Sequence, residues 1–197
     1  MNEQLRPLPG TTQAAEGLPR RRWSVAEIEA MVSRGIILED ERFELIGGEV
    51  VPMSPKGARH EVVRTELAFQ MTRQAPGTLR VAAEVQFNLA DDAYAVPDLL
   101  VYPVTIKVPN VRGPSALLVI EVADSSLAYD LDAKASLYAA HGVREYWVID
   151  AKTLNTTIHR QPAAAGYRDV IGVPANQRLV PEAAPELAVT LAELTLD

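Results

Sequence analysis

Two acidic residues and one lysine occupy positions where apolar side chains are expected. Asp98 and Glu121 lie in apolar runs that are typical of strands, and Lys134 lies on the apolar stripe of a segment with helical periodicity. Burying an unpaired charge is costly or shifts the pKa of the group until it is neutral, so each charge needs a partner or a function. Two carboxylates and a lysine that converge on one point are typical of a phosphodiesterase site with a divalent metal ion.

Lys134 carries the strongest of these signals. Residues 127–141 have the pattern of an amphipathic helix, on which Leu131 and Tyr138 share the apolar stripe. Lys134 lies between them, three residues after the leucine and four before the tyrosine. An exposed ion pair with Asp130, worth a few tenths of a kcal/mol, is the simpler interpretation of the charges. That pair does not explain the apolar neighbours, so we favour a functional lysine.

Composition restricts the class of protein. A chain of 197 residues, 48% of them hydrophobic, suits one soluble domain with a substantial core. The chain has no cysteine, which excludes disulfides, thiolate metal sites and a cysteine nucleophile. No apolar run approaches the ~20 residues that span a bilayer, and the N-terminus lacks the apolar segment of a signal peptide. We therefore expect a cytoplasmic protein without a membrane partner.

The formal net charge of -7 argues against a protein that coats nucleic acid. It is compatible with a nuclease, because a metal site needs carboxylates and its bound cations offset part of their charge. Local groups of basic residues would then contact the substrate, unless they are ordinary solvated surface cations. The candidate groups are Arg20, Arg21 and Arg22, then Lys56, Arg59 and Arg64, then Lys107 and Arg112.

The beginning of the chain differs from the rest. Residues 1–22 contain prolines and glycines without an apolar period and predict a flexible tail. Residues 23–197 predict a single domain. Ser24 and Glu27 match the capping box that opens a helix, which we expect to continue to about residue 33.

Strands dominate the centre of the chain. The expected elements after the first helix are a hairpin with a Gly47-Gly48 turn (43–46 and 49–51), a helix (54–74), three strands (79–89, 98–102 and 116–123), the Lys134 helix (127–141), a strand (145–150) and a hairpin at the sheet edge (156–160 and 167–171). A strand, a helix and a strand across 116–150 predict a parallel crossover. The predicted fold class is therefore α/β, or α+β, with a central mixed sheet flanked by helices.

Several short motifs follow one another along the chain. They are Arg42-Phe43-Glu44-Leu45-Ile46 with Gly48-Glu49, Met53-Ser54-Pro55 with His60, Val96-Pro97-Asp98, Glu121-Val122, the trio Asp130, Lys134 and Tyr138, and the run from Gly142 to Asp150. Together they resemble the Uma-two family, a bacterial group of proposed restriction endonucleases within the PD-(D/E)XK nuclease superfamily. The resemblance spans roughly residues 22–195 and implies a restriction-endonuclease-like core.

The resemblance also implies a metal site. Asp98, Glu121 and the backbone carbonyl of Val122 would bind Mg²⁺ or Mn²⁺ through hard oxygen ligands. The usual pattern of the superfamily has a lysine two positions after the second acid, where this chain has Ala123. In the Uma-two family the following helix supplies the lysine, so Lys134 would orient the attacking water or stabilise the negative charge of the transition state.

Three further residues are implied by the same resemblance. Glu44 and His60 would act as further catalytic residues that hold a water, a second metal ion or a phosphate oxygen, and Gln86 would line the site. The residues alone also allow an outward polar position for Glu44 on its strand and a solvated side chain for His60.

The leading prediction is a metal-dependent endonuclease that hydrolyses DNA, and the alternative is a catalytically silent relative that binds nucleic acid or a partner protein. A homodimer is also expected, because an exposed edge hairpin can pair with a second copy and dimers suit enzymes that cut both strands.

The chain has no Gly-rich phosphate loop and no Gly-x-Ser-x-Gly elbow, which argues against nucleotide triphosphatases and serine hydrolases. Its three histidines lack the spacing of a structural zinc site.

Overall fold

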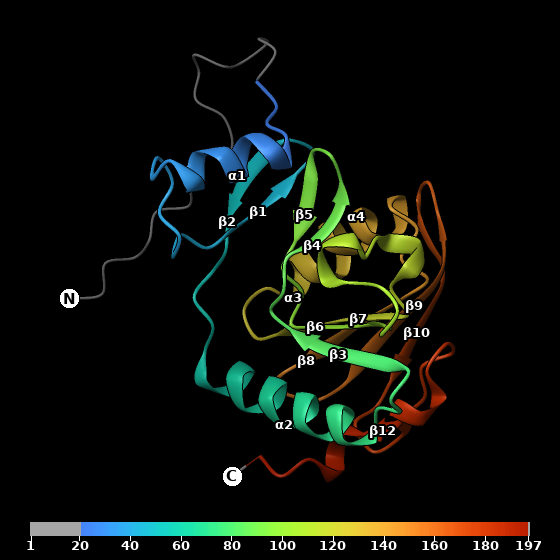
Figure 1. Cartoon of the computed structure of the whole chain (residues 1–197). Helices are drawn as coiled ribbons and strands as arrows, with labels where there is room; N and C mark the ends of the chain where they lie inside the picture. The colour runs from blue at the N-terminus through green and yellow to red at the C-terminus, as the bar shows by residue number, and fades with distance from the viewer. Residues whose placement is uncertain (1–20, 197) are drawn as a thin grey trace, which may run out of the picture.

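A six-stranded mixed sheet forms the centre of the structure, a computed structural model that describes residues 21–196 (Figure 1). In order across the sheet the strands are β10 (Gly166–Val173), β9 (Thr156–Ala163), β8 (Glu145–Asp150), β7 (Leu118–Ala123), β6 (Leu99–Pro103) and β3 (Leu79–Ala83). Strands β7 and β8 pair in parallel, and the other neighbours in this sheet are antiparallel. The predicted mixed sheet and its parallel crossover are therefore confirmed.

Four shorter strands form a second sheet. Its order is β2 (Glu49–Pro52), β1 (Phe43–Ile46), β5 (Ala93–Ala95) and β4 (Phe87–Ala90). The predicted hairpin is present as β1 and β2, and its turn residues Gly47 and Gly48 have φ values of 56° and 79°, a conformation that glycine adopts without strain.

The single strand predicted over residues 79–89 is wrong, because the chain passes here from one sheet to the other. The break is at Glu84, whose φ is 51°, so that β3 joins the large sheet and β4 joins the small one. Apolar residues continue at every second position across the break, from Leu79 to Leu89. Periodicity alone therefore could not locate it.

The α-helices are α1 (Val25–Ser33), α2 (Ala58–Gln74), α3 (Leu127–Tyr129) and α4 (Ala135–Ala140). A π-helical turn, η4 (Asp130–Lys134), lies between α3 and α4. Short 3₁₀ turns are η2 (Val108–Asn110), η3 (Gly113–Ser115), η5 (Pro185–Leu187) and η6 (Leu191–Glu193). The capping box of α1 is confirmed, since the Glu27 N–H donates to Ser24 Oγ and the Ser24 N–H donates to Glu27 Oε2. Within residues 21–196, no helix is long and apolar enough to cross a membrane.

The structure corrects the predicted start of α2 and describes only the end of the predicted N-terminal tail. Helix α2 begins at Ala58 instead of Ser54, because Gly57 is still extended and residues 53–57 form a loop. The tail predicted over residues 1–22 lies, apart from its last two residues, outside the described part of the chain.

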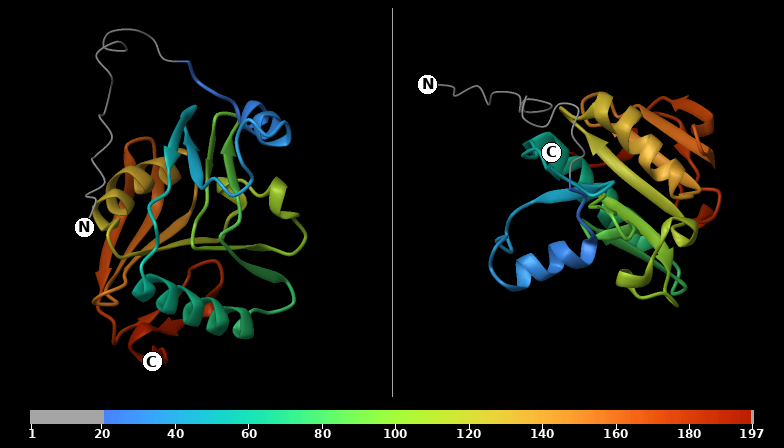
Figure 2. Two further views of the ribbon diagram at one scale, coloured as in Figure 1. Left: turned by 90° about the vertical axis from the view of Figure 1, so that its left-hand side faces the viewer. Right: turned by 90° about the horizontal axis from the view of Figure 1, so that it is seen from above.

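Helices cover both faces of the large sheet (Figures 1 and 2). Leu99 of β6 shares a core with Leu67 of α2, whereas the next residue, Leu100, shares a second core with Tyr138 of α4. Successive side chains of a strand point to opposite faces, so a strand buried on both faces is apolar at nearly every position. This explains why β6 is apolar throughout and why β7 is apolar at every position except Glu121.

The helix that carries Lys134 is irregular. The sequence predicts one helix over 127–141, and the structure has a short α-helical turn, the π-helical turn η4 and then α4. Asp130 and Lys134 begin and end the π-helical turn, and both are buried. Such π-helical turns occur frequently at functional sites.

The C-terminal residues, which the sequence pattern left unassigned, pack against the core on the α2 side. They include a two-stranded sheet of β11 (Arg178–Leu179) and β12 (Val189–Thr190). Leu187 and Leu191 are buried with the residues of α2. The buried Glu145 holds this segment, since it accepts hydrogen bonds from Arg160 Nη2 at 2.7 Å and from the Glu182 N–H at 2.7 Å.

Replacing Leu67 by alanine is expected to lower the free energy of unfolding by about 3 kcal/mol, because the side chain is fully buried and its loss leaves a cavity. Phe69→Ala on the same helix is the matched control. Its ring is 55% exposed, so its removal should cost less than about 1 kcal/mol. Urea unfolding followed by circular dichroism measures both values, and equal losses would contradict the assignment of the buried face of α2.

Candidate active site

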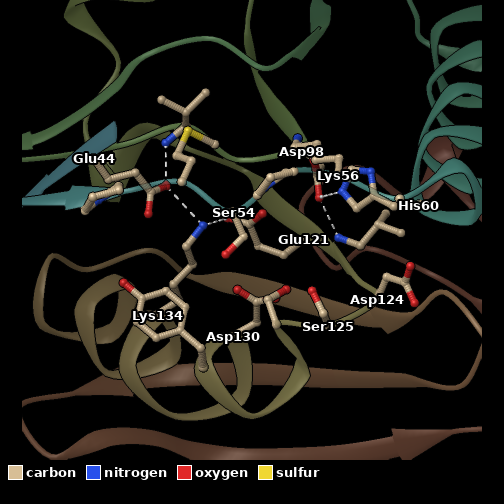
Figure 3. A pocket seen from close by; sticks show the side chains of 18 of the residues that line it. Glu44, Ser54, Lys56, His60, Asp98, Glu121, Asp124, Ser125, Asp130 and Lys134 are labelled. Atoms are coloured by element: carbon tan, nitrogen blue, oxygen red, sulfur yellow. Dashed lines mark hydrogen bonds and ion pairs between the residues drawn. The ribbon is translucent and has the colours of Figure 1, made fainter. Parts of the chain in front are cut away.

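A pocket of about 260 Å³ opens between the β1–β2 hairpin and the adjoining ends of β6 and β7 (Figure 3). The loop 53–57 and the Lys134 helix complete its walls. Its lining includes all of the residues predicted to be catalytic or to bind the metal ion, namely Glu44, His60, Asp98, Glu121, Val122 and Lys134. The fold therefore brings together side chains from both sheets and from two helices.

Strand register brings the two predicted metal-binding acids together. Strands β6 and β7 are antiparallel with Leu99 opposite Ile120, so Asp98, one residue before β6, lies beside Glu121. The carboxylate of Asp98 is fixed there because its Oδ2 accepts a hydrogen bond from the Val122 N–H at 2.8 Å. Both acids are buried, with exposed fractions of 2% for Asp98 and 5% for Glu121.

Lys134 joins the second acid to the small sheet. Its Nζ lies 2.8 Å from Glu121 Oε1 and 3.0 Å from Glu44 Oε1. Tyr138, one turn further along the helix, donates a hydrogen bond to the same Glu121 oxygen at 3.0 Å. Asp130, the partner in the simpler interpretation, instead accepts a hydrogen bond from the Ser126 hydroxyl. Lys134 is therefore a buried residue of the pocket and not half of an exposed surface pair.

Asp98 has a lysine of its own, which the sequence analysis did not assign to the site. Lys56 Nζ lies 2.5 Å from Asp98 Oδ1, and His60 Nε2 lies 3.0 Å from Asp98 Oδ2. The sequence analysis gave Lys56 as a candidate contact to the substrate or a solvated surface cation. Its side chain is only 17% exposed and points into the pocket (Figure 3). Its position four residues before His60, within the motif that starts at Met53, is the signal that could have identified it.

Glu84 is a further residue that the sequence analysis missed. Its Oε1 accepts hydrogen bonds from Lys56 Nζ at 2.7 Å and from Arg42 Nη2 at 2.7 Å, and its Oε2 lies 3.7 Å from Arg64 Nη1. The alternating pattern of residues 79–89 does not reveal these contacts, because the partners of Glu84 are distant in the chain. Gln86, which was expected to line the site, donates a hydrogen bond to Asn88 and lines a neighbouring hollow next to α1.

The two acids have opposite electrostatic environments. Burial, together with the nearby carboxylates of Asp98, Asp130 and Glu44, raises the pKa of Glu121 to about 8 against the opposing charge of Lys134. Burial also acts to raise the pKa of Asp98, but the hydrogen bond from His60 and the charge of Lys56 outweigh it and lower this pKa to about 2. The Glu121 end of the pocket is therefore short of positive charge.

Lys134, which lies between Glu44 and Glu121, remains charged. Burial acts to lower the pKa of Lys134, but the charges of Glu121 and Glu44 outweigh it and raise the pKa above its ordinary value. Its ammonium group is thus a permanent hydrogen-bond donor in the pocket. It cannot serve as a base at neutral pH.

The donor atoms suit a hard divalent cation. Carboxylate and carbonyl oxygens are the ligands that Mg²⁺ and Mn²⁺ prefer, and the raised pKa of Glu121 reflects a need for positive charge at this point. Within residues 21–196, however, no three Asp, Glu or His side chains are already arranged as a ligand group. The ammonium groups of Lys56 and Lys134 lie against the carboxylates of Asp98 and Glu121.

Two comparisons show similarity between this chain and proteins described as nucleases. The Uma2 family model, described as "Putative restriction endonuclease", matches residues 26–193. The fold is similar to a crystal structure described as "a putative nuclease belonging to DUF820", from Anabaena variabilis ATCC 29413. The TM-score is 0.68 at 15% sequence identity, with 86% of this chain and 96% of that chain covered. No functionally curated protein matches the chain.

At this low identity the structural likeness shows the fold, and the restriction-endonuclease-like fold class predicted from the sequence is confirmed. The roles of the individual residues rest on the geometry of the pocket.

Removing the Glu121 carboxyl is expected to change how stability depends on pH. The pKa of this group is about 8 in the folded chain and near 4.5 in an unfolded one, so folding takes up a proton between these values. The stability that the protonated group contributes below its unfolded pKa is therefore lost as pH rises toward 8. In EDTA, urea unfolding at several pH values should show a larger loss between about pH 5 and about pH 8 for wild type than for Glu121→Gln.

Glu193→Gln, at an exposed position, is the control and should follow the wild-type curve. Parallel curves for wild type and Glu121→Gln would contradict the raised pKa.

Proposed function

Because the chain belongs to the Uma2 family, described as "Putative restriction endonuclease", we propose that it is an endonuclease that hydrolyses DNA with the help of a divalent metal ion. The observation that carries the proposal is the meeting of Asp98, Glu121 and Lys134 in one pocket. Two adjacent acids with a charged lysine beside them are the groups that phosphodiester hydrolysis with a metal ion requires.

Asp98, Glu121 and the backbone carbonyl of Val122 are the proposed ligands of Mg²⁺ or Mn²⁺. When bound there, the ion would supply the positive charge that activates water and offsets the charge of the scissile phosphate. Two contacts prepare the ligands for this role. The Val122 N–H fixes Asp98, and the Tyr138 hydroxyl fixes Glu121.

Lys134 is the proposed electrostatic catalyst. As water attacks phosphorus and the bond to the leaving oxygen breaks, negative charge grows on the phosphoryl oxygens, and an ammonium group beside them stabilises it. Glu44 orients this ammonium from the small sheet, since its Oε1 lies 3.0 Å from Lys134 Nζ and also accepts the Val96 N–H. We therefore propose Glu44 as a positioning residue.

His60 is proposed to orient the other acid. Its Nε2 lies 3.0 Å from Asp98 Oδ2, and its buried Nδ1 makes no hydrogen bond, although Glu61 Oε1 is 3.4 Å away. The ring thus holds the Asp98 oxygen that also accepts the Val122 N–H. This leaves the other oxygen, Oδ1, as the one directed toward an incoming cation.

A plasmid assay tests the proposal. Wild type with Mg²⁺ or Mn²⁺ should convert supercoiled DNA to nicked and linear forms, and EDTA should stop the reaction. Lys134→Met should slow cleavage by about 100-fold or more, because it removes a charge that acts on the transition state. Arg178→Met removes a positive charge at an exposed position outside the pocket and is the control that should keep wild-type cleavage.

Calorimetry with Mn²⁺ accompanies the assay, with Asp98→Asn as the variant expected to lose binding. A folded wild-type protein that binds Mn²⁺ yet cuts no supercoiled, linear or single-stranded DNA would contradict the endonuclease. It would favour the alternative, a silent relative that binds nucleic acid or a partner protein.

We also propose that the enzyme acts as a homodimer joined through β10. This strand is the edge of the large sheet, and its Val170 and Ile171 are 55% and 42% exposed. The outer edge of β10 has no neighbouring strand within residues 21–196, so antiparallel pairing with a second copy can extend the sheet. Two pockets in one assembly would suit cleavage of both DNA strands.

Size-exclusion chromatography with light scattering should give a dimer for wild type at micromolar concentration and a monomer for Val170→Lys. Val104→Lys places the same charge at another exposed valine and should remain dimeric. A strictly monomeric wild type would rule the dimer out.

A further inference from the structure

Lys56 occupies the place on Asp98 where a metal ion would bind. Of the two Asp98 oxygens, Oδ2 is held by the Val122 N–H and by His60. The other oxygen, Oδ1, lies 2.5 Å from Lys56 Nζ, so the ammonium group covers the oxygen that remains for a cation. A metal ion that binds this oxygen would compete with the ammonium group for it.

We infer that Lys56 is a displaceable cation, which holds Asp98 in the metal-free protein and transfers to Glu84 when the metal ion binds. The inference rests on the proposed metal site, and it assigns a role to a residue outside the predicted catalytic set. Lys56 acts through Asp98 and is a positioning residue.

Glu84 lowers the free-energy cost of moving Lys56 away from Asp98. A buried ammonium group that loses its partner is strongly destabilising, but Lys56 Nζ already lies 2.7 Å from Glu84 Oε1. Leaving Asp98 therefore breaks one of two ion pairs and leaves no unpaired charge. The charges of Lys56 and Arg64 and the hydrogen bonds from Lys56 and Arg42 lower the pKa of Glu84 to about 2, despite the opposing effect of burial, so the receiving carboxylate is ionised.

The backbone keeps Glu84 in position for this role. Its φ of 51° is uncommon for a residue with a side chain, and it marks the point where β3 ends and the chain turns to the small sheet. Such backbone conformations cost free energy and are often found at functional sites. At this position the carboxylate faces the pocket loop, where it meets Lys56.

Lys56 is also the better placed of the two pocket lysines to move. It lies on the loop 53–57, which has no regular secondary structure, and its side chain is 17% exposed. Lys134 is anchored on a helix, is 8% exposed and is held by carboxylates from both sheets. Entry of a divalent cation at Asp98 should therefore displace Lys56 and leave Lys134 in place as the charge beside the phosphate.

Mn²⁺ binding to the whole protein tests the inference. Isothermal titration calorimetry should give about tenfold tighter binding for Lys56→Met than for wild type, because the internal competitor is gone. Lys56→Arg keeps a competing charge and should bind no more tightly than wild type. Lys152→Met is the matched control, since Lys152 lies at the pocket rim, 3.3 Å from Asp124, and does not contact Asp98. Its affinity should change by less than about threefold.

Thermal unfolding supplies a second readout. Binding to the folded state raises the melting temperature more when the affinity is higher, so saturating Mn²⁺ should shift Lys56→Met further than wild type. A damaged fold would weaken binding, and tighter binding therefore cannot arise from structural loss.

Equal or weaker binding by Lys56→Met would overturn the inference, as would an absence of Mn²⁺ binding in both proteins. Tighter binding in Lys56→Met would support it even if no DNA were cut. That last result would contradict the proposed endonuclease and leave the role of Lys56 standing, so the two failures are distinguishable.

Discussion

The burial of Lys134 between two carboxylates is the interaction on which the site depends. Its ammonium group lies within 3.0 Å of both Glu44 and Glu121, and it supplies positive charge where these two acidic side chains are buried. The contacts also join three parts of the fold, because Glu44 comes from the small sheet, Glu121 from the large sheet and Lys134 from the helix that follows β7. One buried cation therefore links the three parts of the fold that meet at the pocket.

Strand pairing supplies the rigid wall of the pocket, and a loop supplies the adjustable one. Asp98 and Glu121 lie on neighbouring strands whose register is determined by burial on both faces. Lys56 lies on the loop 53–57 opposite them, paired with Asp98 and with Glu84. In the proposed enzyme, the two acids face an ammonium group that a metal ion can displace. The cost of burying so many carboxylates is met by lysines first and, in the proposed enzyme, by a divalent ion afterwards.

Much of the scaffold could be predicted because its causes are local. The Ser24–Glu27 capping box, the Gly47-Gly48 turn and the buried stripe of α2 each follow from residues close together in the chain. Errors arose where a long-range contact overrode the local pattern. The alternation that predicts one strand over 79–89 continues through Glu84, where the chain crosses between sheets. The π-helical turn at Lys134 likewise has no local pattern that distinguishes it from a regular helix.

The sequence by itself determined the identity of the unusual charges. An acid in an apolar strand and a lysine on an apolar helical stripe are anomalous wherever the chain folds, because burial of a charge is always costly. Only the tertiary structure decided which charges meet. Lys56 and Glu84 lie in a loop and in an ordinary alternating segment, where a charged side chain is expected to be solvated, and their pairing arises from packing of segments distant in the chain. An ion pair forms when two opposite charges lie close together in the folded structure, and the spacing of the residues along the chain does not give that distance.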